Sequence, residues 1–281
     1  MKKCAIFVVI VFVTMMFWTT GCTDKARSGI DTLATDSIVD TTKVDSLEML
    51  LEEQPMPKAA DELFDDFIFN FAGNNKLQLR RVKFPLMQVN NGDTSYLSKE
   101  KWQVEHFFMR QGYYTLILDS RRQLQFTKDT NVERAVVEKI FLNRKFVKSY
   151  VFQRIHGEWM LTSVEGQPLV KNVNASFLQF YQRFATDSAF LHKSLNETIA
   201  FSGPDPDDDF AELHGDIMPE QWDVIGPTDL PSGTIYNINY GQTYKQSGYK
   251  VFLLRGIANG EELEMTFQRK DGQWMLTRLV E

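Results

Sequence analysis

The stretch Phe152–Thr162, FQRIHGEWMLT, returns as FQRKDGQWMLT at Phe267–Thr277. Eight of the eleven positions are identical, and the two copies lie 115 residues apart. Average amino-acid usage would give about one identity in such a stretch, so the match indicates an internal duplication. Alternating apolar and polar residues before each turn predict a half-buried strand, and the His-Gly and Asp-Gly pairs predict tight hairpins.

Two further matches keep the same order upstream. Three phenylalanines recur at i, i+3 and i+7, which places them on one face of a helix, and we interpret this face as core. A tryptophan two residues after a glutamate also recurs. The matched residues are Phe64, Phe67 and Phe71 with Phe177, Phe180 and Phe184, and Trp102 with Trp222.

These matches divide the folded part into a first domain at residues 59–168 and a second at residues 169–281. In each, one or two helices are expected first and an antiparallel meander afterwards. The leading helix is the only long apolar partner for the meander, so each half is expected to be a cone-shaped α+β domain with its own core. The expected strands cover residues 113–118, 136–142 and 146–155, and residues 234–240 and 249–257.

With this order of elements and the duplicated Gly-x-Trp-Met-Leu-Thr hairpin, each half resembles the nuclear-transport-factor-like (cystatin-like) fold. The whole chain resembles uncharacterised bacterial lipoproteins that carry two such domains in tandem. The resemblance implies a curved antiparallel sheet wrapped around a helix, with one open end. An unrelated α+β sandwich, duplicated in tandem, is the alternative fold.

The N-terminus is typical of an exported lipoprotein. Lys2 and Lys3 precede an apolar run at residues 4–18, which is too short to span a membrane and fits a signal peptide of residues 1–21. The tetrapeptide Thr-Thr-Gly-Cys that ends at Cys22 resembles a lipobox, although its first residue is usually Leu. We expect lipid on Cys22 and a location in the cell envelope, at the outer membrane, with the choice between its periplasmic and surface faces left open. An ordinary signal peptide or an uncleaved anchor is the alternative.

Residues 22–58 form an expected flexible tether, since they are polar and lack sustained apolar periodicity. Four Asp-Ser/Thr triplets in it resemble the acceptor pattern of a periplasmic O-glycosylation system. Chance triplets in a Thr- and Asp-rich tether are the alternative. The candidate acceptors are Thr32, Ser37, Thr41 and Ser46.

Cysteine usage and charge exclude several functions. The two cysteines are Cys4, which would leave with the signal, and Cys22, which would carry lipid. Disulfides, thiolate zinc sites and cysteine nucleophiles are therefore not expected in the mature chain. Removal of Lys2 and Lys3 leaves 29 basic against 37 acidic residues, a net charge of −8 that argues against nucleic acid as a partner. No cofactor motif is present, and we expect none.

Three aromatic or histidine residues are candidates for ligand contact. Trp102 and Trp222 would lie at the cone mouths, where an indole can contact a sugar or a lipid, or would simply cover the core. His106 is followed by two phenylalanines that could line a cavity.

An acidic run gives weak calcium candidates, but it lacks the glycine of a calcium loop, and a solvated loop is the alternative. The calcium candidates are Asp205, Asp207, Asp209 and Glu212.

The sequence favours a non-catalytic envelope lipoprotein that binds a small apolar or saccharide-like ligand, or an envelope protein, at the cone mouths or between them. Enzymes of the cone superfamily use Asp, His or Tyr inside the cone as general acid or base. The resemblance therefore implies a hydro-lyase or isomerase as the runner-up. A structural spacer or assembly subunit is the third alternative.

Overall fold

The computed structural model describes residues 56–205, 208–244, 247–257 and 259–281. The predicted signal peptide, Cys22 and the four glycosylation candidates lie outside these residues, so cleavage, lipidation and glycosylation stay predictions. All described residues belong to one unit of the chain. No helix in this part of the chain is long and apolar enough to cross a membrane.

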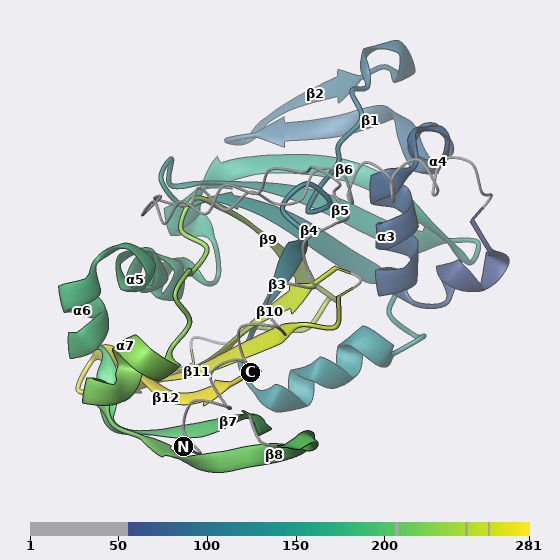
Figure 1. The fold of residues 1–281 in the computed structure, drawn as a ribbon. Helices are drawn as coiled ribbons and strands as arrows, with labels where there is room; N and C mark the ends of the chain where they lie inside the picture. Colours follow the sequence, from purple (N-terminus) through teal and green to yellow (C-terminus); the bar gives the residue numbers. More distant parts are fainter. Residues whose placement is uncertain (1–55, 206–207, 245–246, 258) are drawn as a thin grey trace, which may run out of the picture. The chain divides into compact units, whose positions relative to one another are not determined.

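The two halves repeat one order of elements (Figure 1). In each, a polar side chain caps a short second helix: Asn74 accepts from the Leu77 N–H at 2.8 Å, and Asp187 from the Phe190 N–H at 3.0 Å. The first half contains α3 (Phe64–Gly73), α4 (Asn75–Arg81), β1 (Val82–Asn90), β2 (Asp93–Leu97), β3 (Tyr113–Leu118), β4 (Arg134–Phe141), β5 (Phe146–Ile155) and β6 (Glu158–Pro168). The second contains α5 (Ala175–Thr186), α6 (Ser188–Lys193), β7 (Leu195–Asp205), β8 (Asp208–Ile217), α7 (Trp222–Ile225), β9 (Thr234–Asn239), β10 (Tyr249–Gly256), β11 (Glu262–Lys270) and β12 (Gln273–Val280). Short 3-10 helices lie at Lys58–Asp61, Lys99–Lys101, Arg121–Lys128, Leu169–Lys171 and Pro219–Gln221.

The predicted hairpin turns are confirmed. His156 and Gly157 have φ of 53° and 83°, and Asp271 and Gly272 have φ of 49° and 81°. Positive φ at both central residues matches the twist of the flanking strands, and these residue types tolerate it. Both hairpins also shift register at a bulge, where the repeated threonine hydroxyl donates to a bulge carbonyl at 3.2 Å, Thr162 to Val151 and Thr277 to Thr266.

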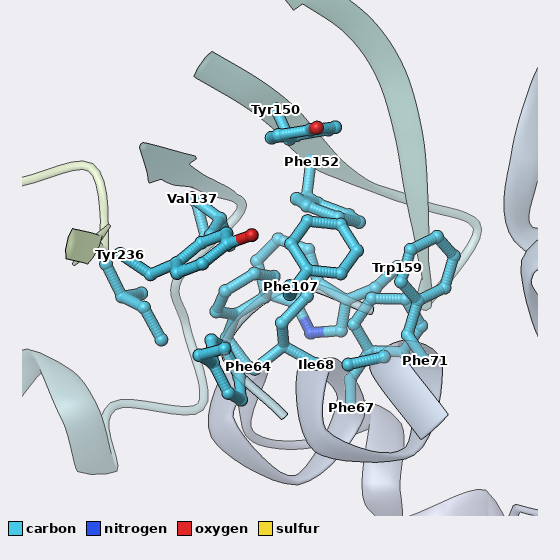
Figure 2. Close-up of a cluster of buried hydrophobic side chains, with 14 of the residues drawn as sticks. Phe64, Phe67, Ile68, Phe71, Phe107, Val137, Tyr150, Phe152, Trp159 and Tyr236 are labelled. Atoms are coloured by element: carbon cyan, nitrogen blue, oxygen red, sulfur yellow. The ribbon is translucent and has the colours of Figure 1, made fainter. Parts of the chain in front are cut away.

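The phenylalanine face of the leading helix is core in both halves, as predicted. Figure 2 shows the first-half cluster, in which the Phe64 ring lies 5.3 Å from Phe152 and 4.9 Å from Trp159. In the second half, Phe177 lies 5.6 Å from Trp274. An arginine guanidinium covers each tryptophan, at 4.9 Å for Trp159 and 5.0 Å for Trp274. The two tryptophans therefore occupy equivalent surroundings.

One sheet of twelve strands runs through both halves of the described chain, in the order β2-β1-β6-β5-β4-β9-β3-β10-β11-β12-β7-β8. The prediction of two cones, each closed by its own meander, is therefore wrong. The sheet is also mixed, since β1 runs parallel to β6, β7 to β12 and β3 to β9. The hairpins β1/β2 and β7/β8 were not among the expected strands. The boundary between residues 168 and 169 stays a prediction.

The halves exchange one strand each. β3 pairs with β10, and β9 pairs with β4, so each meander ends on a strand from the other half. The physical reason is that both faces of β3 are apolar. Leu116 and Leu118 belong to the first core, which surrounds α3, and Ile117 belongs to the second core, which surrounds α5. A strand of this kind is stable where the sheet is covered on both faces, which the centre of the shared sheet provides.

Candidate functional site

A hollow of about 430 Å³ opens where the loop after Trp102 meets β4 and β9. Its volume is in the range of small-ligand sites. Lys139 on β4 and Tyr236 on β9 are paired in the register, so both halves contribute to the wall. We call it the Glu105 hollow; its lining includes Val104, Glu105, His106, Arg110, Lys139 and Tyr236.

A buried glutamine fixes the backbone of Glu105. Gln78 of α4 is fully buried; its Nε2 donates to the Glu105 carbonyl at 2.9 Å, and its Oε1 accepts from the Glu105 N–H at 3.1 Å. The same Oε1 accepts from Nε1 of Trp102 at 3.2 Å. Trp102 thus helps to position the loop that carries Glu105 and His106.

Phe107 completes the loop in an unusual conformation. Its φ is 49°, a region that costs a bulky residue about 1 to 3 kcal/mol. The buried ring offsets this cost by packing 4.9 Å from Tyr150 on β5, edge to face. This backbone turn keeps Glu105 next to the sheet.

The Glu105 carboxylate is surrounded by donors. Tyr150 Oη donates to Oε2, while Lys139 Nζ donates to Oε1 at 3.0 Å and Tyr236 Oη at 3.4 Å. Lys148 Nζ lies 4.0 Å from Oε2. Burial alone would raise the pKa of Glu105, but the hydrogen bond from Tyr150 and the charge of Lys139 outweigh burial, and the pKa lies below its ordinary value. Glu105 is therefore ionised at neutral pH.

The two tyrosines beside this carboxylate keep their protons. Burial, followed by the charge of Glu105, raises the pKa of both Tyr150 and Tyr236. Burial lowers the pKa of Lys148, and the nearby Glu105 opposes that shift. Lys139 has further N–H donors beyond its bond to Glu105, and Arg110 also lines the hollow, so the hollow suits a ligand rich in hydrogen-bond acceptors.

A second hollow of about 260 Å³ lies beside α3, and we call it the Asp65 cleft. Tyr240 Oη donates to Asp65 Oδ1, and Arg255 Nη1 lies 3.9 Å from Oδ2. Burial raises the pKa of Asp65 to about 6, although the Tyr240 hydrogen bond and the Arg255 charge oppose it. Burial and the Asp65 charge raise the pKa of Tyr114 to about 12. The lining includes Asp65, Ile68, Phe69, Phe108, Tyr114 and Ile257.

The structure brings together two of the three ligand-contact candidates from the sequence. His106 lines the Glu105 hollow, and Trp102 lies beside it, with its ring 6.2 Å from Phe84. Trp222 lies in the second core, buried, with its ring 6.3 Å from Phe184. A ligand contact through any of them stays a prediction.

The calcium candidates are only partly described. Asp205 ends β7 and Glu212 lies on β8, where its Oε2 is 3.5 Å from His214 Nε2. Asp207 and the side chain of Asp209 lie outside the described part. Among the described residues no group of three His, Cys, Asp or Glu side chains is placed to hold a metal ion.

The fold, a large curved sheet combined with helices, belongs to a known class. A crystal structure of an NTF2-like protein from Bacteroides fragilis NCTC 9343 is 39% identical to this chain, with a TM-score of 0.73, and the match covers 80% of this chain and 98% of that one. The fold is therefore NTF2-like, with mixed α and β structure.

The family follows from the sequence match. Residues 43–281 match a family described as a domain of unknown function (DUF4348), and the chain belongs to that family. No curated protein matches the chain.

Apart from His106 and the two phenylalanines that follow it, the residues that form the two hollows were not predicted from the sequence. Glu105 stands next to that candidate, and Lys139 and Lys148 interrupt strands that are otherwise largely apolar. A charged residue between buried neighbours of a strand was therefore the sequence signal that could have indicated these hollows.

Proposed function

We propose that this protein is a lipid-anchored envelope protein that reversibly binds a small saccharide-like ligand in the Glu105 hollow, without transforming it. The lipobox-like sequence that ends at Cys22 supports the anchor. The donor-rich wall of the hollow supports a ligand with many hydroxyl oxygens.

The observation that carries this proposal is the fixed arrangement of Glu105. Its backbone is held by Gln78 and its carboxylate by Tyr150 and Lys139, so contacts within the chain fix the geometry of the site. The core around α3 is filled by aromatic side chains (Figure 2), so a ligand would bind at the mouth and not deep inside.

Calorimetric titration of the full chain in detergent, with a panel of neutral and acidic mono- and disaccharides, tests the binding. Tyr236→Phe removes one hydroxyl from the wall and should weaken binding about 5-fold, the equivalent of one hydrogen bond of about 1 kcal/mol. Tyr96→Phe, at a tyrosine 66% exposed on β2, is the matched control and should have no effect. Absence of binding for the whole panel would refute the proposal and favour a structural spacer.

The anchor has its own test. Cys22→Ala should move the protein from the membrane fraction to the soluble fraction, and the native chain should carry the added mass of acyl chains. Membrane association that survives this substitution, with no acyl mass on the native chain, would show that the anchor is wrong.

Acid–base catalysis at the Asp65 cleft is the second candidate function. It is favoured by a carboxyl group with a pKa of about 6, next to the hydroxyl of Tyr240 in a cleft lined partly by aromatic residues. A hydro-lyase or isomerase of this kind should exchange a substrate C–H with deuterium from solvent. Asp65→Asn should abolish the exchange, and Asp93→Asn, at an exposed aspartate of β2, should preserve it. Equal exchange by both variants would exclude Asp65 as the base.

A further inference from the structure

The second half contains a natural comparison for the Glu105 hollow. The repeat places Leu254 and Leu263 where the first half has Lys139 and Lys148, and both pairs are direct neighbours in the register. The same alignment of the halves places Met265 at the position of Tyr150 and Ile225 at that of Glu105. These two counterparts are apolar as well.

This contrast shows that the fold does not require the charges. Leu254, Leu263 and Ile225 pack against the second core, so the duplicated sheet forms with apolar residues at these positions. Burying a carboxylate and ordering two lysines costs free energy that an apolar set avoids. The charged set in the first half thus has a role other than folding.

The local charge has the opposite sign to the chain. The protein has a formal net charge of −6, yet Arg110 and Lys139 line the Glu105 hollow and Lys148 Nζ lies 4.0 Å from the Glu105 carboxylate. Among the described residues of the lining, Glu105 is the single acidic one, and its oxygens already accept from Tyr150 and Lys139. The positive charge exceeds what Glu105 neutralises.

We infer that the Glu105 hollow selects a negatively charged ligand, a sugar that carries a carboxylate, which would lie against Lys139 and Arg110. This inference rests on the proposed binding function and adds the ligand class to it. Hydroxyls of the sugar would pair with Tyr236 and with the loop. Glu105 serves as the fixed counter-charge that holds Lys139 in place.

The test compares D-glucuronate with D-glucose, which share a ring and differ in one carboxylate. Titrated into the full chain in detergent at low salt, glucuronate should bind at least ~10-fold more tightly, and about 0.5 M NaCl should remove most of the difference. Lys139→Met and Arg110→Met should each reduce the preference to about 2- to 3-fold. Lys193→Met, at an exposed lysine of α6, should leave it unchanged.

The outcomes separate the two proposals. Equal affinity for both sugars would overturn the charge selection and leave the binding function intact. Tighter binding of D-glucosamine would also overturn it, because Glu105 would then recognise a cation. Binding of none of the three sugars would refute the binding function, and the charge selection with it. Arg110 is exposed, so its variant tests the inference even if Lys139→Met does not fold.

Discussion

Asp65→Asn should stabilise the protein relative to the native chain, and this stabilisation should be larger at neutral pH than at acid pH. The folded state raises the pKa of Asp65 from 3.8 to about 6, which disfavours the ionised form. Between these two values the unfolded chain loses its proton while the folded chain keeps it, so the stability contributed by this group falls as the pH rises. The shift of about 2 pH units corresponds to about 3 kcal/mol at pH 7. Because the carboxyl is 27% exposed, we expect about 2 to 3 kcal/mol.

Urea unfolding followed by tryptophan fluorescence measures this effect. The free energy of unfolding of Asp65→Asn minus that of the native chain should increase by about 2 kcal/mol from pH 4 to pH 7 and then stay level. Asparagine can still accept the hydrogen bond from Tyr240, so the comparison isolates ionisation. Asp93→Asn, at an exposed aspartate of β2, is the control for the loss of one negative charge. A difference that is constant within about 0.5 kcal/mol across this pH range would refute the reasoning.

Three further predictions concern the site and the shared sheet. Tyr150→Phe should raise the pKa of Glu105, measured by NMR of its carboxyl carbon, and destabilise the fold by about 1 to 3 kcal/mol; an unchanged pKa would contradict the hydrogen bond. Asn237→Ala removes the 2.7 Å bond to buried Glu138 and should cost about 2 to 4 kcal/mol in urea unfolding, whereas a cost below about 0.5 kcal/mol would be inconsistent with the network. Residues 59–168 expressed alone should lack protected amides in hydrogen exchange, because β9 is missing; native-like protection would show that the exchange of strands is dispensable.

Local features of the fold could be predicted because they depend on neighbouring residues. The strands expected at residues 113–118 and 146–155 have the same bounds as β3 and β5. The hairpin turns followed from their Gly residues, and the helix face followed from the spacing of its phenylalanines. The strand β1 was missed because Pro85 argues against a strand, and the structure accommodates it with a register shift between Val82 and Met87.

The shared sheet could not be predicted from duplication, which indicates two similar units but not how they pair. One signal was present: the runs at residues 116–118 and 251–254 are continuously apolar and do not alternate. Strands of this kind are buried on both faces, which a single cone with one covered face does not explain. The partner strand is a long-range property that periodicity does not specify.

The Glu105 hollow was missed for the same reason. Glu105, Lys139, Tyr150 and Tyr236 are far apart in the sequence, and Tyr236 reaches the others only because β9 crosses to the first half. Comparing the two repeats position by position would have shown that Lys139 aligns with Leu254. A charged residue at an apolar position of its own duplicate is a usable sign of function.

The pairing of β9 with β4 also affects the order in which the chain can fold during synthesis. The ribosome completes β6 at Pro168, but β9, the neighbour of β4 in the sheet, begins only at Thr234, which is 66 residues later. At about 5 to 20 residues per second, the N-terminal portion stays unfinished for roughly 3 to 13 seconds. Throughout that interval the apolar surface that β9 will cover is available to chaperones.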